Sequence, residues 1–143
     1  MAFYVDIAGK LSRKQKFIDY TYKILDHYFG ERMKRDVDIN ITVLTRLDND
    51  YLGTCDGDRT TINIDLAKYK KSKKLTLEQI AENLAHELVH AKQFLRGEIN
   101  GENLKYRYKS GFIKDCSKMS YRETPWEKEA YGTERELFNL YWK

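Results

Sequence analysis

The sequence predicts an α+β fold, in which a small, mostly antiparallel sheet packs on a central helix between an N-terminal and a C-terminal helix. Three observations support this class. Two segments alternate apolar and polar residues, and three segments have the apolar spacing and end signals of helices. No repeat or linker rich in Gly, Ser and Pro divides the chain. With 143 residues, we expect one domain that spans residues 1–143.

The first half of the chain predicts a helix followed by two strands. Apolar residues fall near helical spacing through residues 12–30, with Ser12 as the N-cap and Gly30 as the end signal. Residues 37–43 and 60–66 alternate apolar and polar side chains and are rich in β-branched residues. This alternation is typical of half-buried strands.

The segment between the two strands, residues 48–59, is rich in turn residues. A calcium loop that starts at Asp48 would have Gly53 at its sixth position, as required. However, Leu52 and Arg59 stand where such a loop needs an oxygen ligand and a glutamate. The segment is therefore interpreted as a hairpin connection.

Two basic segments raise the question of nucleic-acid binding. Lys68–Lys74 contains five lysines in seven residues, and Lys105–Lys109 alternates cations with tyrosines. A solvated connector explains the first segment and a strand with one wet face explains the second. Because the net charge is only +4, the sequence does not favour a nucleic-acid partner.

The central and C-terminal helices have the clearest boundaries. Residues 76–79 (Thr-Leu-Glu-Gln) form a capping-box pattern, an apolar stripe follows, and Gly97 is placed to end the helix. The C-terminal helix is predicted to begin at Thr124-Pro125 and to run to about Tyr141, because proline is favoured at the first helical position.

Cysteine usage and hydropathy point to an intracellular protein. Cys55 and Cys116 are isolated, which favours two free thiols over a disulfide. No apolar run approaches the roughly 20 residues of a spanning helix, and the N-terminus lacks the layout of a signal peptide. We expect a cytoplasmic monomer without a membrane partner.

Two histidines in the central helix are spaced to bind one metal ion. His86 and His90 are four residues apart, so they project from the same helix face one turn apart. Glu87 points about 100° around the helix from His86 and reaches the rim of such a site. A carboxylate there could take a proton from a zinc-activated water and pass it to a leaving amine. The alternative is that both histidines are ordinary helix-surface residues.

The third metal ligand must be a carboxylate, because His27, the remaining histidine, is expected to be a surface residue. The start of the C-terminal helix offers Glu123, Glu127 and Glu129. Only one of Glu127 and Glu129 can face a metal ion, since their side chains diverge by about 200°. Glu127 also completes a local capping-box pattern with Thr124, and spacing alone leaves the choice open.

Three segments together resemble small single-domain zinc metallopeptidases of the gluzincin type, the minimal form found in many phage and microbial proteins. They are Thr61–Ile64, the HExxH segment with its next three residues (His86–Gln93), and Pro125–Tyr131. The resemblance covers roughly residues 37–141. It implies a zincin-like domain, one Zn²⁺ per chain, and hydrolysis of a peptide or protein substrate with Glu87 as the general base.

The resemblance also implies roles for further residues. A glutamate followed three residues later by alanine is typically the third ligand, which favours Glu127 with Ala130. The strand before the helix typically pairs with substrate along a free edge, and Thr60–Leu66 would be that strand. Its implied substrate-binding residues are Ile62, Asn63 and Ile64. The candidates for stabilising the oxyanion are Tyr106, Tyr108, Tyr121 and Tyr131.

Two other functions remain open from the sequence. The chain could be a binding or effector protein that retains a metallopeptidase scaffold, in which zinc is structural or poorly used. Family members often have Asp or Asn where this chain has Tyr131, and that departure leaves room for this alternative. A basic nucleic-acid-binding domain with an accidental histidine pattern is the third alternative.

Overall fold

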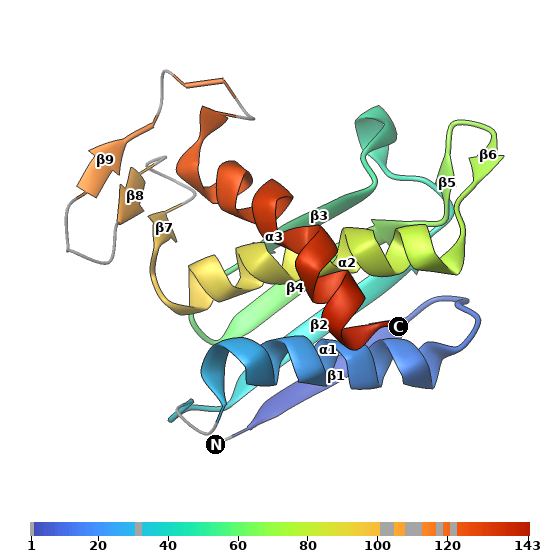
Figure 1. Cartoon of the computed structure of the whole chain (residues 1–143), viewed down its shortest axis with the longest axis horizontal. Coiled ribbons are helices and arrows are strands. Elements are labelled where there is room, and N and C mark those ends of the chain that lie inside the picture. The colour runs from blue at the N-terminus through green and yellow to red at the C-terminus, as the bar shows by residue number, and fades with distance from the viewer. Residues whose placement is uncertain (1, 31–32, 101–104, 108–112, 117–118, 121–122) are drawn as a thin grey trace.

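The computed structural model describes residues 2–30, 33–100, 105–107, 113–116, 119–120 and 123–143 (Figure 1). Its main elements are a four-stranded sheet and three helices, which confirms the α+β class. The sheet consists of β1 (Phe3–Ala8), β2 (Val37–Leu44), β3 (Gly53–Gly57) and β4 (Thr61–Ala67), and the helices are α1 (Lys14–Phe29), α2 (Leu77–Leu95) and α3 (Pro125–Tyr141).

Shorter elements complete the described chain. A 3₁₀ turn (Asp48–Asp50) precedes β3, and the basic segment after β4 folds as a hairpin of β5 (Tyr69–Lys70) and β6 (Lys73–Lys74). A small antiparallel sheet is formed by β7 (Ile99–Asn100), β8 (Lys105–Arg107) and β9 (Ile113–Asp115).

The main sheet is mixed, which differs from the expected mostly antiparallel sheet. Its order is β1-β2-β4-β3, with β1–β2 and β2–β4 parallel and β3–β4 antiparallel. The first parallel pair arises because α1 crosses from the end of β1 to the start of β2. The sequence analysis did not include β1, although Phe3, Val5 and Ile7 alternate with more exposed residues along it.

The strand order corrects the expected substrate strand. β4 is hydrogen-bonded to β2 on one side and to β3 on the other, so it has no free edge. Ile62 and Ile64 are fully buried in the core, and Asn63 lies between them on the opposite face of the sheet. These three residues therefore cannot pair with an extended substrate. In the described part of the chain, β3 is the outer strand beside β4.

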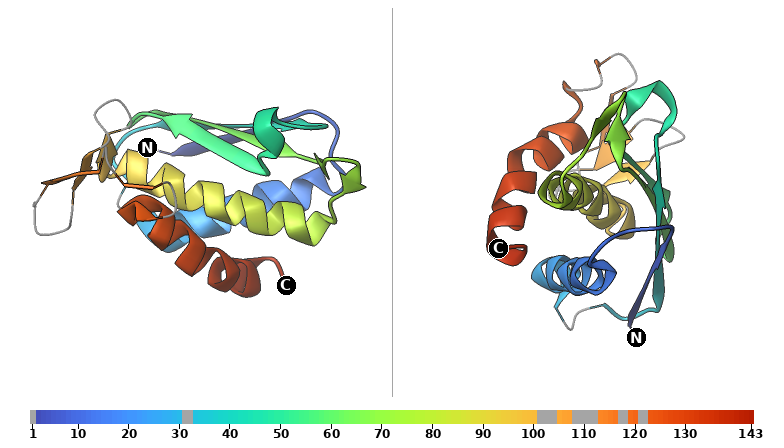
Figure 2. Two further views of the ribbon diagram at one scale, coloured as in Figure 1. Left: turned by 90° about the horizontal axis from the view of Figure 1, so that it is seen from above. Right: turned by 90° about the vertical axis from the view of Figure 1, so that its right-hand side faces the viewer.

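The elements form three layers, which Figure 2 shows edge-on: the sheet, then α1 and α2, then α3. The strands bury alternate apolar side chains against the middle layer. Because α2 lies between the sheet and α3, the polar side chains in its second half are buried, including Lys92 and Gln93. This burial is what places ionisable groups of α2 in a low-dielectric environment.

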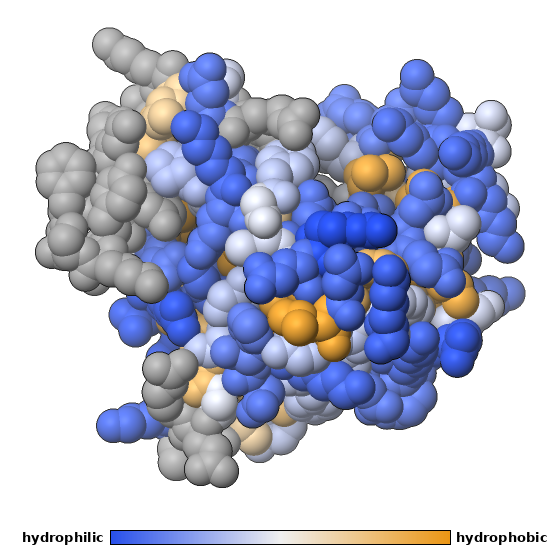
Figure 3. All heavy atoms as spheres, in the orientation of Figure 1, coloured by the Kyte–Doolittle hydropathy of each residue, from blue (hydrophilic) through white to orange (hydrophobic). Residues whose placement is uncertain are grey.

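The face that carries α3 is mostly hydrophilic, with apolar side chains in small separate patches (Figure 3). Among the described residues, no helix combines the length and the hydropathy needed to cross a membrane.

The two cysteines are free thiols, as expected.

The helix boundaries follow the local signals to different degrees. The capping box of α2 forms as predicted, and Gly97, at φ 68°, follows the end of that helix. α1 begins later than expected: Ser12 is not its cap, and Arg13 occupies the N-cap position in a left-handed conformation at φ 59°. The side chain of Thr124 makes no capping hydrogen bond to α3.

Candidate metal centre

The central helix presents His86 and His90 on one face. The Thr76 hydroxyl accepts a hydrogen bond from the Gln79 amide at 3.1 Å, and the Gln79 side chain accepts one from the Thr76 amide at 2.9 Å. This reciprocal cap fixes the start of α2 ten residues before His86. The two imidazole rings lie 4.9 Å apart between centroids, and both residues are buried, at 7% and 6% exposure.

Glu127, in the first turn of α3, brings a carboxylate to both imidazoles. Its Oε1 lies 3.1 Å from His86 Nε2 and 3.2 Å from His90 Nε2, and its Oε2 lies 3.1 Å from His90 Nε2. The residue is 3% exposed. Of the two carboxylates left open by the spacing, the structure therefore places Glu127 at the histidines.

Glu129 lies on a different side of α3 and has other partners. It accepts hydrogen bonds from Lys92 Nζ and Gln93 Nε2, each at 2.7 Å. Glu123, the third carboxylate considered, is exposed. The expected surface position of His27 is confirmed, because its ring is exposed and its Nδ1 lies 2.7 Å from the Tyr141 hydroxyl.

The three side chains could hold a metal ion. One ligand atom from each of His86, His90 and Glu127 can be chosen so that all lie within 4.8 Å of one another. Ligands about 2.05 Å from a tetrahedral ion are separated by about 3.3 Å from each other. The nitrogen–oxygen distances of 3.1–3.2 Å are close to this separation. The donor set of two nitrogens and one carboxylate suits a divalent transition metal.

Gln93 orients His90. Its Oε1 lies 2.7 Å from His90 Nδ1, while its Nε2 donates to the Trp126 carbonyl at 2.9 Å and to Glu129. Because the amide nitrogen is occupied as a donor, its oxygen accepts the Nδ1 hydrogen of His90. The Nε2 of His90 is then directed toward Glu127, and it can bind a metal ion once it has lost its proton.

Glu134 lies beside the Nδ1 atom of His86, as Gln93 lies beside the Nδ1 atom of His90. Its Oε2 lies 3.5 Å from His86 Nδ1, on the side of the ring opposite Glu127. Glu134 follows Glu127 by seven residues, which is two helical turns, so both carboxylates lie on one face of α3. The ring of Tyr131 packs against His86 with centroids 4.6 Å apart.

Sequence reasoning missed the roles of Gln93 and Glu134. Each was visible as a helical neighbour: Gln93 follows His90 by three residues, and Glu134 follows Glu127 by seven. The spacing alone does not show which of the many polar neighbours on α2 and α3 faces a histidine. Tyr108 and Tyr121 lie outside the described residues, and Tyr106 belongs to β8.

Glu87 is buried beside the histidines, at 6% exposure. Burial raises the pKa of its carboxyl, the histidines lower it and the charges of Glu127 and Glu134 raise it further, to about 7. Gly53 in β3 leaves room for this side chain: a Cβ at Gly53 would come within 3.0 Å of both Glu87 Cγ and Oε2.

A cavity of about 440 Å³ lies beside His86 and Glu87. His86, Glu87 and Tyr131 line it, together with Asn83 and Glu134. Residues 50–53, which lead into the outer strand β3, line it as well. The cavity therefore brings a candidate metal ligand, a buried carboxyl and a sheet edge together.

Both histidines bind a proton more readily than an ordinary histidine does when no cation is bound, because the pKa of each is raised. Burial would lower the pKa of His86, but hydrogen bonds to Glu127 and Glu134 and the charge of Glu87 outweigh it and raise the pKa to about 10. The pKa of His90 is also raised, because Glu127 and Glu87 outweigh its burial. A bound cation must displace these protons.

We expect the protein to bind one metal ion per chain and the His86→Ala variant to lose it. The change removes one of three protein ligands, and Glu127 then keeps a buried charge with one fewer partner. Metal content is measured by plasma mass spectrometry on protein purified without added metal and after reconstitution. His27→Ala is the matched control and should retain the ion. Equal metal content in the two variants would contradict the assignment.

The affinity for the metal ion should rise with pH well above neutrality. A histidine with an ordinary pKa of about 6.5 would give an affinity that levels off above pH 7. Because the pKa of His86 is about 10, protons still compete between pH 7 and pH 9. The raised pKa of His86 also means that its protonated form stabilises the folded protein without metal. This stabilisation is complete below about pH 6.5 and is lost as the pH rises toward 10. Competition with a chromophoric chelator at several pH values measures the affinity, and a plateau above pH 7 would contradict the raised pKa.

Comparisons with family models, with curated proteins and with solved structures gave no match to this chain.

Proposed function

We propose that this chain is a zinc-dependent peptidase in which Glu87 is the general base. The observation that carries the proposal is the placement of the buried Glu87 carboxyl next to His86, on the cavity that also reaches the sheet edge. If His86, His90 and Glu127 had no base beside them, a structural or metal-storage role would fit these ligands equally well. The resemblance of the HExxH segment and of Pro125–Tyr131 to small zinc metallopeptidases adds to this proposal.

Two histidines and one carboxylate are a donor set that zinc takes in hydrolytic sites, with one position left open. A bound zinc ion supplies Lewis acidity, which lowers the pKa of a coordinated water and polarises the scissile carbonyl. Iron also binds to two histidines and a carboxylate in oxygenases. The adjacent Glu87 favours hydrolysis, because that reaction needs a proton acceptor beside the attacking water.

Glu87 is suited to transfer a proton in both directions. A general acid–base group works best when its pKa is near the working pH, and burial raises the pKa of Glu87 to about 7. In the ionised form, Glu87 takes a proton from the attacking water. It then donates that proton to the leaving amine, which prevents the amine from recombining with the new carboxyl group.

The outer strand β3 is the best candidate for the substrate-pairing edge. It lies at the end of the main sheet, and the residues before and at its start line the cavity. An extended peptide could add to this edge by main-chain hydrogen bonds, the general mode of β-strand addition. In this proposal, the peptide passes along Gly53 and reaches Glu87 and His86.

Two polar side chains that line the cavity, those of Asn83 and Tyr131, are candidates for contacting the carbonyl oxygens of a substrate. Asn83 lines the cavity, and its buried amide Nδ2 has no hydrogen-bond partner among the described residues. Tyr131 is 40% exposed and lies against His86. We expect Tyr131, among the four tyrosines considered, to steady the oxyanion, because hydrogen-bond donors at that position stabilise developing charge.

Replacing Glu87 by Gln should lower turnover by roughly 10²–10⁴-fold while metal content stays at one ion per chain. The amide has the same shape but cannot accept the proton. Turnover is measured on a degenerate peptide library by mass spectrometry, with protein reconstituted with zinc. Glu136→Gln is the matched control, because Glu136 is an exposed glutamate on α3.

Two outcomes would contradict this function. Unchanged turnover in the Glu87→Gln variant would exclude the proposed mechanism. A wild-type protein that holds zinc but cleaves no peptide would instead favour a binding protein built on the same scaffold.

Gly53→Ala should lower turnover by about 10- to 100-fold and leave metal binding intact. The added methyl would lie 3.0 Å from the Glu87 side chain, so the carboxyl must shift by a few tenths of an ångström from its position. Gly132→Ala on α3 is the control, since a Cβ there meets nothing within 4 Å. Steady-state kinetics and metal analysis on both variants provide the test. Equal activity of the two would show that the close packing of Gly53 does not position Glu87.

A further inference from the structure

A second cavity, of about 860 Å³, lies at the N-terminal end of α2, roughly 14 Å along the helix from His86. It is formed by the loop between β1 and α1 on one side and by the segment from the end of β4 to the start of α2 on the other. Both segments follow strands of the parallel part of the sheet, β1 and β4. Ligand sites commonly lie beyond the carboxyl ends of parallel strands.

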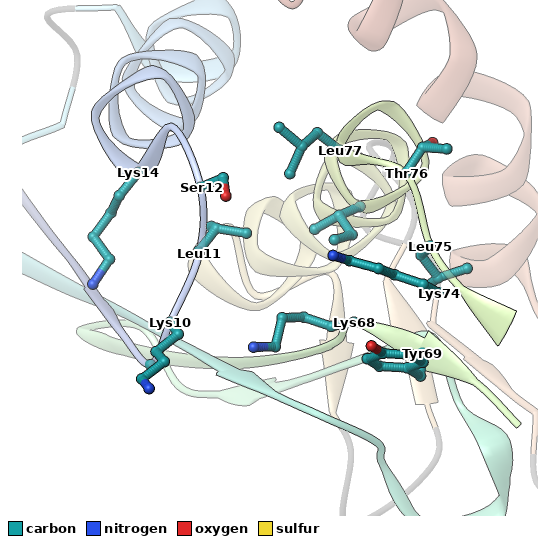
Figure 4. A pocket seen from close by; sticks show the side chains of 12 residues that line it. Lys10, Leu11, Ser12, Lys14, Lys68, Tyr69, Lys74, Leu75, Thr76 and Leu77 are labelled. Carbon is teal, nitrogen blue, oxygen red and sulfur yellow. The ribbon is translucent and has the colours of Figure 1, made fainter. Parts of the chain in front are cut away.

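Four lysines line this cavity, namely Lys10, Lys14, Lys68 and Lys74, and no aspartate or glutamate lines it. Lys14 and Lys68 are half-buried. None of the four has an ion-pair partner among the residues that the structure describes. Figure 4 shows that Lys68 and Lys74 extend from the β4–α2 side toward the loop that carries Lys10 and Leu11. Like charges gathered in a concave site repel one another and attract an anion.

The cavity also has an apolar part. Leu11 points into the space between the lysines (Figure 4), and Leu75, Leu77 and Ile80 line the cavity as well. Tyr69 contributes a half-buried ring, over which the guanidinium of Arg46 lies 5.1 Å from the ring centroid. An inorganic anion alone would leave this apolar surface uncovered. The lining therefore fits a ligand that has both anionic and apolar portions.

We propose that this cavity binds a phosphorylated organic ligand, with its phosphate groups on the lysines and its apolar or aromatic portion on Leu11, Leu77 and Tyr69. A free nucleotide and the end of a single nucleic-acid strand share this chemistry. This assignment gives part of the basic segment Lys68–Lys74 a binding role, in place of the solvated connector expected from the sequence. It concerns residues outside the metal group and stands whether or not the chain is a peptidase.

The test is binding of three probes to the full chain: inorganic pyrophosphate, adenosine diphosphate, and a fluorescein-labelled ten-nucleotide single-stranded DNA. Calorimetry measures the first two, and fluorescence anisotropy measures the third. The pocket variant is Lys68→Gln/Lys74→Gln. The matched control is Lys23→Gln/Lys128→Gln, which removes two exposed lysines that do not line the cavity. Circular dichroism verifies that both variants are folded.

We expect the adenosine diphosphate affinity to fall about tenfold or more in the pocket variant and to change little in the control. Tenfold corresponds to about 1.4 kcal/mol. The diphosphate nucleotide should also bind more tightly than pyrophosphate, because it covers the apolar part. Tighter binding of the DNA, with the same loss in the pocket variant, would support the proposal and identify a nucleic-acid end as the source.

Three results would overturn the proposal. One is that none of the probes binds. Another is equal loss of binding in the pocket and control variants, which would mean that net charge alone attracts the anions. The last is loss of binding in His86→Ala with no change in the pocket variant, which would place the phosphate on the metal ion. Peptidase activity is not a readout in this experiment, so its outcome is separate from that of the proposed function.

Discussion

The carboxylate of Glu127 is buried between the imidazoles of His86 and His90, and this contact joins the start of α3 to α2. A carboxylate withdrawn from water is costly unless cations or hydrogen-bond donors surround it. The raised pKa of both histidines shows that their protonated forms stabilise this carboxylate, and a divalent cation would stabilise it in their place. Burying the Glu127 carboxylate costs free energy, and a positive partner offsets this cost. The burial therefore favours binding of a cation at this site.

A ring of second contacts holds these side chains in place. Gln93 connects three parts of the structure, because its amide contacts His90, the Trp126 backbone and Glu129. Lys92, 3% exposed, is neutralised by Glu129 at 2.7 Å and by Glu98 at 2.8 Å. These contacts are possible because α3 covers the polar side of α2. Partners of this kind fix the direction of a metal-binding imidazole, and losing one typically lowers metal affinity or activity by about 10- to 100-fold.

The sequence was informative where a signal is local. The capping box at Thr76, the spacing of His86 and His90, and proline at the start of α3 each follow from contacts within one or two helical turns. Strand alternation predicted β2 and β4 but carries no information on direction or neighbours. For that reason the parallel pairing was not predicted, and Ile62–Ile64 was placed at a free edge that belongs to β3.

The site residues divide in the same way. His86, Glu87 and His90 follow from helix geometry, whereas the choice of Glu127 over Glu129 rested on resemblance until the structure placed Glu127 at the histidines. Glu134 lies 48 positions after His86 in the chain, and no periodicity links the two. The second cavity also depends on the topology, because Lys10 and Lys68 line one cavity only when β1 and β4 belong to the same sheet.

The central claim is that one metal ion binds between the Nε2 atoms of His86 and His90 and the carboxylate of Glu127. A crystal structure of the zinc-reconstituted protein, with anomalous diffraction recorded on both sides of the zinc absorption edge, tests it most directly. The account predicts one anomalous peak about 2.0–2.1 Å from both nitrogens and about 2.0–2.2 Å from a Glu127 oxygen. A peak elsewhere on the chain, or well-ordered side chains at this site with no peak between them, would contradict it.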